Sequence, residues 1–177
     1  MTTALKASQN DMTMVLKAIR FATIKHQGQY RKVSGKEYVT HVIAVSYIVA
    51  AFKSSKYFVA LICAAILHDI LEDTDTTFIE LATEFSPMIA SIVLELTNDE
   101  VQITLLGKLE YQKKKLVGMS SYALVIKLAD RLNNISDNPT LKMINETIEL
   151  MDHLRKNRKL TNTQKALMAD IYAECQK

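Results

Sequence analysis

The sequence predicts an all-α protein, a single compact bundle of about eight helices. Apolar residues recur at intervals of three and four along most of the chain, which is the spacing of amphipathic helices. Glycine and proline are rare, at four and two among 177 residues, which argues against a barrel or sandwich with many tight turns. Hydrophobic residues make up 49% of the chain, enough to give one domain a sizeable core.

Breaks in this pattern set the expected helices. The first covers residues 11–26, where Met14, Ala18 and Ala22 lie on one stripe. The others cover residues 38–52, 56–73, 78–85, 88–96, 105–119, 123–134, 141–153 and 163–174. Helix-starting residues precede several of them: Thr77 with Glu80 in the capping-box position, Ser86 before Pro87, and Ser120.

An apolar run leads directly into a polar cluster at residues 64–74. If the whole segment is helical, His68 and Glu72 are one turn apart, as are Asp69 and Asp73. Adjacent carboxylates are costly to bury unless a cation or hydrogen bonds compensate them, and imidazole beside carboxylate suits a divalent transition metal better than calcium. The alternative is a helix end whose polar residues face water. The apolar run extends right up to His68, which favours a site.

Two further helices supply residues of the same kind. His41 lies near the start of the second helix, and Asp130 ends the apolar run of the seventh. A lone histidine on an apolar helix is usually a core residue. Asp130 has Lys127 and Arg131 at helical neighbour spacing, so a buried ion-pair set is as physical as metal ligation. A divalent ion is a physical reason for four such groups to converge: His41, His68, Asp69 and Asp130.

The loop at residues 27–37 is the most polar and basic loop in the chain. Arg31 and Lys32 are adjacent and lie between Gly28 and Gly35, an arrangement that can hold a phosphate or stack on a base. A solvated loop is the simpler interpretation when the loop is considered alone.

The ordered set His, His-Asp, Asp resembles the signature of the HD-domain metal phosphohydrolases. Segments 26–41, 68–74 and 127–134 are further similar to the hydrolase domain of the RelA/SpoT homologue family, over most of the chain. By layout, the chain resembles the stand-alone small alarmone hydrolases of that family. Asn133 and Asp137 depart from the family's usual residues, which are a histidine or aromatic residue and, in bifunctional members, a threonine.

The resemblance implies one HD-type metal-dependent phosphohydrolase domain over residues 1–177, which removes the 3′-pyrophosphate from (p)ppGpp with Mn²⁺. The implied residues are His41, His68, Asp69 and Asp130 as ligands of Mn²⁺; Glu72 and Asp73 as the pair that orients and deprotonates the attacking water; and Arg31, Lys32 and Asn134 as contacts of the guanine, the base or phosphate region, and the ribose. The chemistry is coherent, because a bound metal activates water while a nearby carboxylate accepts the proton.

Composition limits the partners. The net charge of +3 permits a small anionic ligand such as a guanine nucleotide, and no dense basic block indicates nucleic-acid binding. Cys63 and Cys175 give neither a zinc spacing nor a disulfide framework, which fits the reducing cytoplasm. No apolar run has membrane-spanning length, and residues 1–10 lack the apolar core of a signal peptide. The sequence leaves a homo-oligomer open.

Two other functions fit the same residues less well. One is hydrolysis of another nucleotide, such as NADPH or a deoxynucleotide, which phosphate release from a nucleotide panel would distinguish. The other is a catalytically silent nucleotide-binding module or a toxin-neutralising partner. The pair Glu72 and Asp73 argues against the second, because a pure binder has no need of residues that activate water.

Overall fold

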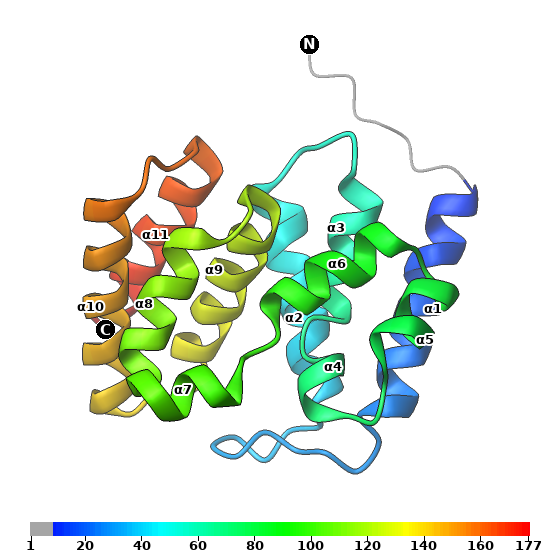
Figure 1. The fold of residues 1–177 in the computed structure, drawn as a ribbon, viewed down its shortest axis with the longest axis horizontal. Helices are drawn as coiled ribbons and strands as arrows, with labels where there is room; N and C mark the ends of the chain where they lie inside the picture. Colours follow the sequence, from blue (N-terminus) through cyan, green and yellow to red (C-terminus); the bar gives the residue numbers. More distant parts are fainter. Residues whose placement is uncertain (1–8) are drawn as a thin grey trace.

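Eleven α-helical segments make up residues 9–177, the part of the chain that the computed structural model describes (Figure 1). The all-α prediction is confirmed. Most of the segment 1–10, judged too polar for a signal peptide, lies outside the described residues. None of the eleven helices combines the length and the apolar character needed to cross a bilayer. Their bounds are α1 Gln9–Lys25, α2 Val39–Phe52, α3 Phe58–Ile66, α4 Ile70–Asp73, α5 Phe78–Glu84, α6 Pro87–Leu96, α7 Glu100–Leu106, α8 Lys108–Gly118, α9 Ser121–Ser136, α10 Leu141–Asn157 and α11 Asn162–Glu174.

Side-chain caps begin several helices at the predicted residues. The Ser86 side chain accepts a hydrogen bond from the third residue of α6, and Ser120 does the same for α9. Thr77 caps α5 by accepting from the amide of Glu80 at 3.1 Å. The Glu80 carboxylate lies 3.2 Å from the amine of Lys25, and the cap of α5 consists of the bond to the Thr77 side chain.

The prediction of a single helix at residues 56–73 is wrong. The chain forms α3 and α4, with residues 67–69 as a turn between them. At this turn Nδ1 of His68 donates to the carbonyl oxygen of Ala65 at 2.7 Å, so a side chain occupies an acceptor that the helix would otherwise use. His68 and Asp69 therefore lie on the turn itself, and the chain changes direction there.

The helix expected at residues 105–119 begins earlier and is interrupted. α7 starts at Glu100, where the Asp99 side chain accepts from the amide of Gln102. Gly107 has φ 80° and separates α7 from α8. Glycine adopts this backbone conformation without the strain that a Cβ would add, so the chain can turn at this position.

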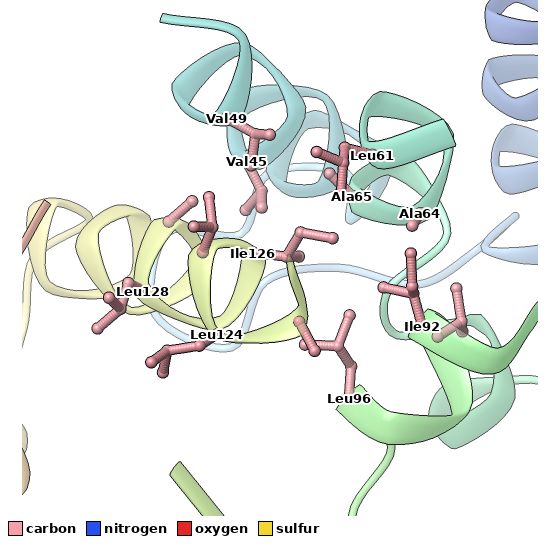
Figure 2. Packing of buried hydrophobic residues seen from close by; sticks show 14 of the residues in the cluster. Val45, Val49, Leu61, Ala64, Ala65, Ile92, Leu96, Leu124, Ile126 and Leu128 are labelled. Atoms are coloured by element: carbon pink, nitrogen blue, oxygen red, sulfur yellow. The ribbon is translucent and has the colours of Figure 1, made fainter. Parts of the chain in front are cut away.

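Apolar side chains of α2, α3, α6 and α9 form the centre of the core (Figure 2). Ala64 and Ala65 let α3 approach its neighbours closely, while larger side chains fill the space around them. The larger residues labelled there are Val45, Val49, Leu61, Ile92, Leu96, Leu124, Ile126 and Leu128. Full burial of each leucine or isoleucine contributes roughly 1.5–3 kcal/mol, so this packing fixes α2, α3 and α9 relative to one another. The loop after α1 passes α4 at one end of the bundle, where Gln29 bonds the carbonyl oxygen of Asp73 (Figure 1).

Candidate metal centre and nucleotide cavity

Three elements that the core holds together deliver His41, His68 and Asp130 to one place. His41 lies on α2, His68 on the turn after α3, and Asp130 on α9. Nε2 of His41 lies 3.3 Å from Oδ1 of Asp130, and Nε2 of His68 lies 3.8 Å from the same oxygen. One ligand atom from each residue lies within 4.8 Å of the others, and all three side chains are buried. Two imidazoles and a carboxylate at this separation can coordinate one divalent ion.

Hydrogen bonds on the far side of both imidazoles prepare them for metal ligation. Nδ1 of His68 donates to the Ala65 carbonyl oxygen, and Nδ1 of His41 donates to Oδ1 of Asn133, both at 2.7 Å. These oxygens accept, so each Nδ1 carries a proton, and a neutral ring in this orientation presents the lone pair of Nε2 to the cluster. Nε2 of His68 is buried and lies 2.8 Å from Oδ2 of Asp69, but it forms no hydrogen bond. A metal ion fits this orphaned nitrogen.

Asp69, the fourth predicted ligand, borders the cluster. Its Oδ2 lies 3.7 Å from Nε2 of His41 as well as close to His68. The hydroxyl of Tyr38 donates to the same oxygen at 2.6 Å and holds it in place. Tyr38 is not among the site residues predicted from the sequence, although its position three residues before His41 places both on the same side of the chain as α2 begins.

The surroundings of Asp130 fit both predicted alternatives, a buried ion pair and metal ligation. Oδ1 faces the two imidazoles and accepts from Nδ2 of Asn134 at 2.6 Å, while Oδ2 lies 3.0 Å from Nζ of Lys127. Burial opposes the charge on Asp130, but Lys127 and His41 hold the pKa of its carboxyl well below the usual range. Arg131 points elsewhere and donates to Gln112 at 3.3 Å.

The cluster is electrostatically prepared for a cation. Burial lowers the pKa of His41, but the carboxylates of Asp130 and Asp69 outweigh that effect and raise it to about 9. A proton on His41 therefore balances the two buried carboxylates when no other cation does so. A divalent ion would displace that proton, since metal ligation requires the neutral imidazole.

A cavity of about 710 Å³ opens over the cluster, a size typical of small-molecule sites. Eight of the nine predicted site residues line this cavity, and the ninth, His68, lies beneath its surface with 1% of its area exposed. The eight are Arg31, Lys32, His41, Asp69, Glu72, Asp73, Asp130 and Asn134. The fold thus brings together residues that are about a hundred positions apart in the chain.

Arg31 ties its loop to the end of α9. Its Nη2 donates to Oδ1 of Asn134 at 2.6 Å, and its Nε lies 3.5 Å from Oδ2 of Asp137. The simpler interpretation of residues 27–37 as a solvated loop is therefore wrong for Arg31, whose side chain is 16% exposed. Lys32 is exposed at the rim of the cavity.

Glu72 and Asp73 lie on α4 at the other side of the cavity. Both carboxylate oxygens of Glu72 accept from Asn98, one from its amide nitrogen at 3.0 Å and one from Nδ2 at 2.9 Å. Partial burial of its carboxyl group and the neighbouring Asp69 raise the pKa of Asp73, although the Tyr38 hydroxyl opposes them. Nothing local to residues 97–100 indicates that Asn98 would meet Glu72, so this contact has no signal in the sequence.

The family model of the HD domain matches residues 18–147 of this chain. The cluster and the helices that carry it are therefore those of an HD-domain protein. The chain is 34% identical over 129 residues to the guanosine-3′,5′-bis(diphosphate) 3′-pyrophosphohydrolase MESH1 of Xenopus tropicalis, covering 72% of this chain and 71% of that protein. It is 37% identical over 128 residues to the protein of the same name from Danio rerio, covering 70% and 68%. The chain belongs to the MESH1 family of HD-domain proteins, within the wider RelA/SpoT homologues.

A solved structure and a longer relative extend the comparison. The structure described as a metazoan ortholog of SpoT that hydrolyzes ppGpp superimposes with a TM-score of 0.76, at 28% identity, over 97% of this chain and 98% of that one. A GTP pyrophosphokinase of Streptomyces coelicolor is 34% identical over 133 residues, which are 73% of this chain but 15% of that protein. The family resemblance predicted from the sequence is confirmed, and the HD domain with its His/Asp cluster defines a site for a divalent metal.

Proposed function

We propose that the protein is a cytoplasmic, manganese-dependent guanosine-3′,5′-bis(diphosphate) 3′-pyrophosphohydrolase that works as a single HD-type domain over residues 1–177. It hydrolyses ppGpp to GDP, and pppGpp to GTP, with release of pyrophosphate. The observation that carries the proposal is the convergence of His41, His68 and Asp130 beneath a cavity that Arg31 and Asn134 line. Relatives named for this activity, which cover most of the chain, support it.

The metal would be held by four residues: His41, His68, Asp69 and Asp130. When bound, it lowers the pKa of a water molecule and polarises a phosphoryl oxygen. Tyr38 fixes the carboxylate of Asp69, and Asn133 fixes the imidazole of His41, so the ligands need little rearrangement.

Glu72 and Asp73 have different roles toward the attacking water. Glu72 orients the water, because Asn98 holds both oxygens of its carboxylate in one direction. Asp73 accepts the proton of the attacking water, since its raised pKa favours protonation of its carboxylate. Positive charge for the phosphates comes from Lys108 and Arg131, which line the same cavity.

The nucleoside end of the substrate binds between the loop and α9. Arg31 stacks on the guanine, because Asn134 and Asp137 hold its planar guanidinium in place. Asn134 hydrogen-bonds the ribose; its amide oxygen and nitrogen each have one position left after bonding to Arg31 and Asp130. Lys32, exposed at the rim, contacts the base or phosphate region.

Metal analysis combined with a nucleotide panel tests the proposal. The purified protein is incubated with ppGpp, pppGpp, NADPH and a deoxynucleoside triphosphate, with Mn²⁺ or with EDTA, and pyrophosphate and phosphate release are measured. We expect pyrophosphate from ppGpp and pppGpp only when metal is present. Release confined to NADPH or the deoxynucleotide would assign another substrate. Nucleotide binding without any release would assign a binding module.

Two variants separate the roles of metal and acidic pair. Asp69→Ala should abolish pyrophosphate release together with metal binding, whereas Glu72→Ala should abolish release with the metal retained. His153→Ala is the matched control, because this histidine lies on α10 and does not line the cavity. Turnover that survives either site variant would contradict the mechanism.

A further inference from the structure

A lysine amine is held at the point where α6 ends and α8 passes it. Nζ of Lys115 donates to the carbonyl oxygens of Leu96, at 3.0 Å, and Thr97, and to the hydroxyl of Tyr111 at 3.2 Å. The same nitrogen lies 3.4 Å from Oδ1 of Asn98. Lys115 therefore gathers three consecutive residues, 96–98, around one ammonium group.

Tyr111 closes this network from the other side. Its hydroxyl accepts from the amide of Asp99 at 2.8 Å as well as from Lys115, one turn further along α8. The segment from Leu96 to Asp99 is thus fixed on α8 by a lysine and a tyrosine. Beyond it, α7 contributes no buried residue and offers little support of its own.

The network ends at Glu72. Among residues 9–177, the hydrogen bonds that this carboxylate accepts come from Asn98, through its main-chain and side-chain nitrogens. A two-point contact fixes the direction of the carboxylate, but only if both nitrogens of Asn98 lie correctly. The position of Asn98 depends on the conformation of residues 96–98, which Lys115 stabilises.

Keeping a lysine at this position costs folding free energy. Burial, together with the nearby Lys127, lowers the pKa of Lys115 to about 8, although Glu72, Glu95 and Asp99 act in the opposite direction. An apolar side chain of similar length would fill the same space without that cost. Buried groups with such shifts are found at functional sites more often than elsewhere.

We propose that Lys115 is a positioning residue for Glu72: its ammonium group organises residues 96–98 so that Asn98 holds the Glu72 carboxylate toward the metal cluster. The proposal rests on the proposed function, in which Glu72 orients the attacking water. Lys115 does not line the cavity over the metal cluster, so it acts through Asn98. Loss of its amine should therefore slow the chemical step and leave nucleotide binding largely intact.

A helix-capping role is the competing explanation, since a lysine near a helix end commonly bonds the last carbonyls. That role would lower the melting temperature without changing kcat of the folded protein. The two explanations differ in kcat, which is therefore the decisive measurement.

The experiment measures three variants: Lys115→Met, Asn98→Ala and the double variant that combines these two changes. Lys114→Met is measured beside them. Lys114 is the exposed neighbour on the same helix and serves as the matched control. We expect each single site variant to lower kcat for pyrophosphate release about tenfold, with KM within about twofold and metal content unchanged. The double variant should be no slower than the slower single variant, because the two residues act as one unit. Asn98 is only half-buried, so Asn98→Ala tests the same network if Lys115→Met folds poorly.

Three results would overturn the proposal: an unchanged kcat for Lys115→Met, a loss confined to KM, or losses that multiply in the double variant. A crystal structure of Lys115→Met gives a readout that does not depend on activity. We expect Nδ2 of Asn98 to move out of hydrogen-bond reach of Glu72, and a contact that persists at 2.9 Å contradicts the proposal. If the wild-type protein releases no pyrophosphate from ppGpp, the proposed function fails, while this distance still decides the positioning role.

Discussion

The metal cluster and the acidic pair face one cavity, yet different forces hold them. His41, His68 and Asp130 are 3%, 1% and 6% exposed, and each lies where an apolar helix or turn leaves the core. Their geometry follows from core packing, which changes little unless several large side chains move together. The cluster is therefore as rigid as the bundle itself.

The acidic pair depends on a few hydrogen bonds instead. Glu72 and Asp73 lie on the four-residue helix α4 and are exposed. Asn98 binds the side chain of Glu72, and Gln29 donates to the carbonyl oxygen of Asp73 at 2.7 Å. A hydrogen bond of this kind contributes about 0.5–1.5 kcal/mol net, so small changes in two loops can move the pair. The site thus combines a fixed ligand set with an adjustable pair, and variants should separate the two.

Removal of a cluster carboxylate should have the largest effect. Asp130→Ala deletes a proposed metal ligand and leaves the ammonium of Lys127 buried without its partner. We expect metal binding to be lost, pyrophosphate release to fall more than about a thousandfold, and stability to fall by about 3–5 kcal/mol. Elemental analysis, activity and thermal melting measure the three effects. Asp170→Ala, an exposed aspartate on α11, is the control, and an Asp130→Ala protein with full metal content would show that the cluster does not bind the ion.

A change in the acidic pair should affect catalysis alone. Glu72→Gln keeps the shape of the side chain but removes its charge, and α4 lies at the surface. We expect kcat to fall about a hundredfold or more, with metal content and melting temperature close to those of the wild type. A large loss of stability would mean that the pair belongs to the rigid part of the site.

Hydrophobic patterning predicted the rigid half of this site better than the adjustable half. His68 and Asp130 interrupt long apolar runs, so the sequence itself marks where a buried segment meets polar groups. The turn at residues 67–69 was not predicted, because the bond from His68 to a backbone carbonyl competes with helix formation and leaves no periodic signature.

Contacts between loops could not be predicted at all. The amine of Lys115 contacts Leu96 and Asn98 because residues 96–99 pass close to α8. The course of these residues depends on how α6 and α8 pack. Asn133 was noted only as a departure from the family, yet it bonds the imidazole of His41. These positions are set by tertiary packing, which residue types and spacing do not specify.

The charge balance of the cluster predicts how the metal-free protein responds to pH. The pKa of His41 is raised from 6.5 to about 9 in the folded state, so its proton stabilises the fold fully below pH 6.5, and this stabilisation is lost as the pH rises through 9. The stability of wild type relative to His41→Gln, measured in EDTA by chemical denaturation, should therefore decrease across that range, by about 3 kcal/mol at most. A difference that is constant or increases with pH would contradict this charge balance. With Mn²⁺ present the dependence should weaken, because the ion replaces the proton.

The smallest expected effect lies at the nucleotide end of the cavity. Arg31→Ala removes a guanidinium that Asn134 and Asp137 hold in place, while the cluster and the acidic pair keep their own supports. We expect KM for ppGpp to rise about tenfold with kcat within about twofold, because the proposed stacking on the base would contribute equally to the ground state and the transition state. Arg20→Ala, at an exposed position on α1, is the control. A fall in kcat instead would mean that Arg31, through Asn134 and its bond to Asp130, also sets the geometry of the metal cluster, so that the nucleotide loop and the rigid half of the site are coupled.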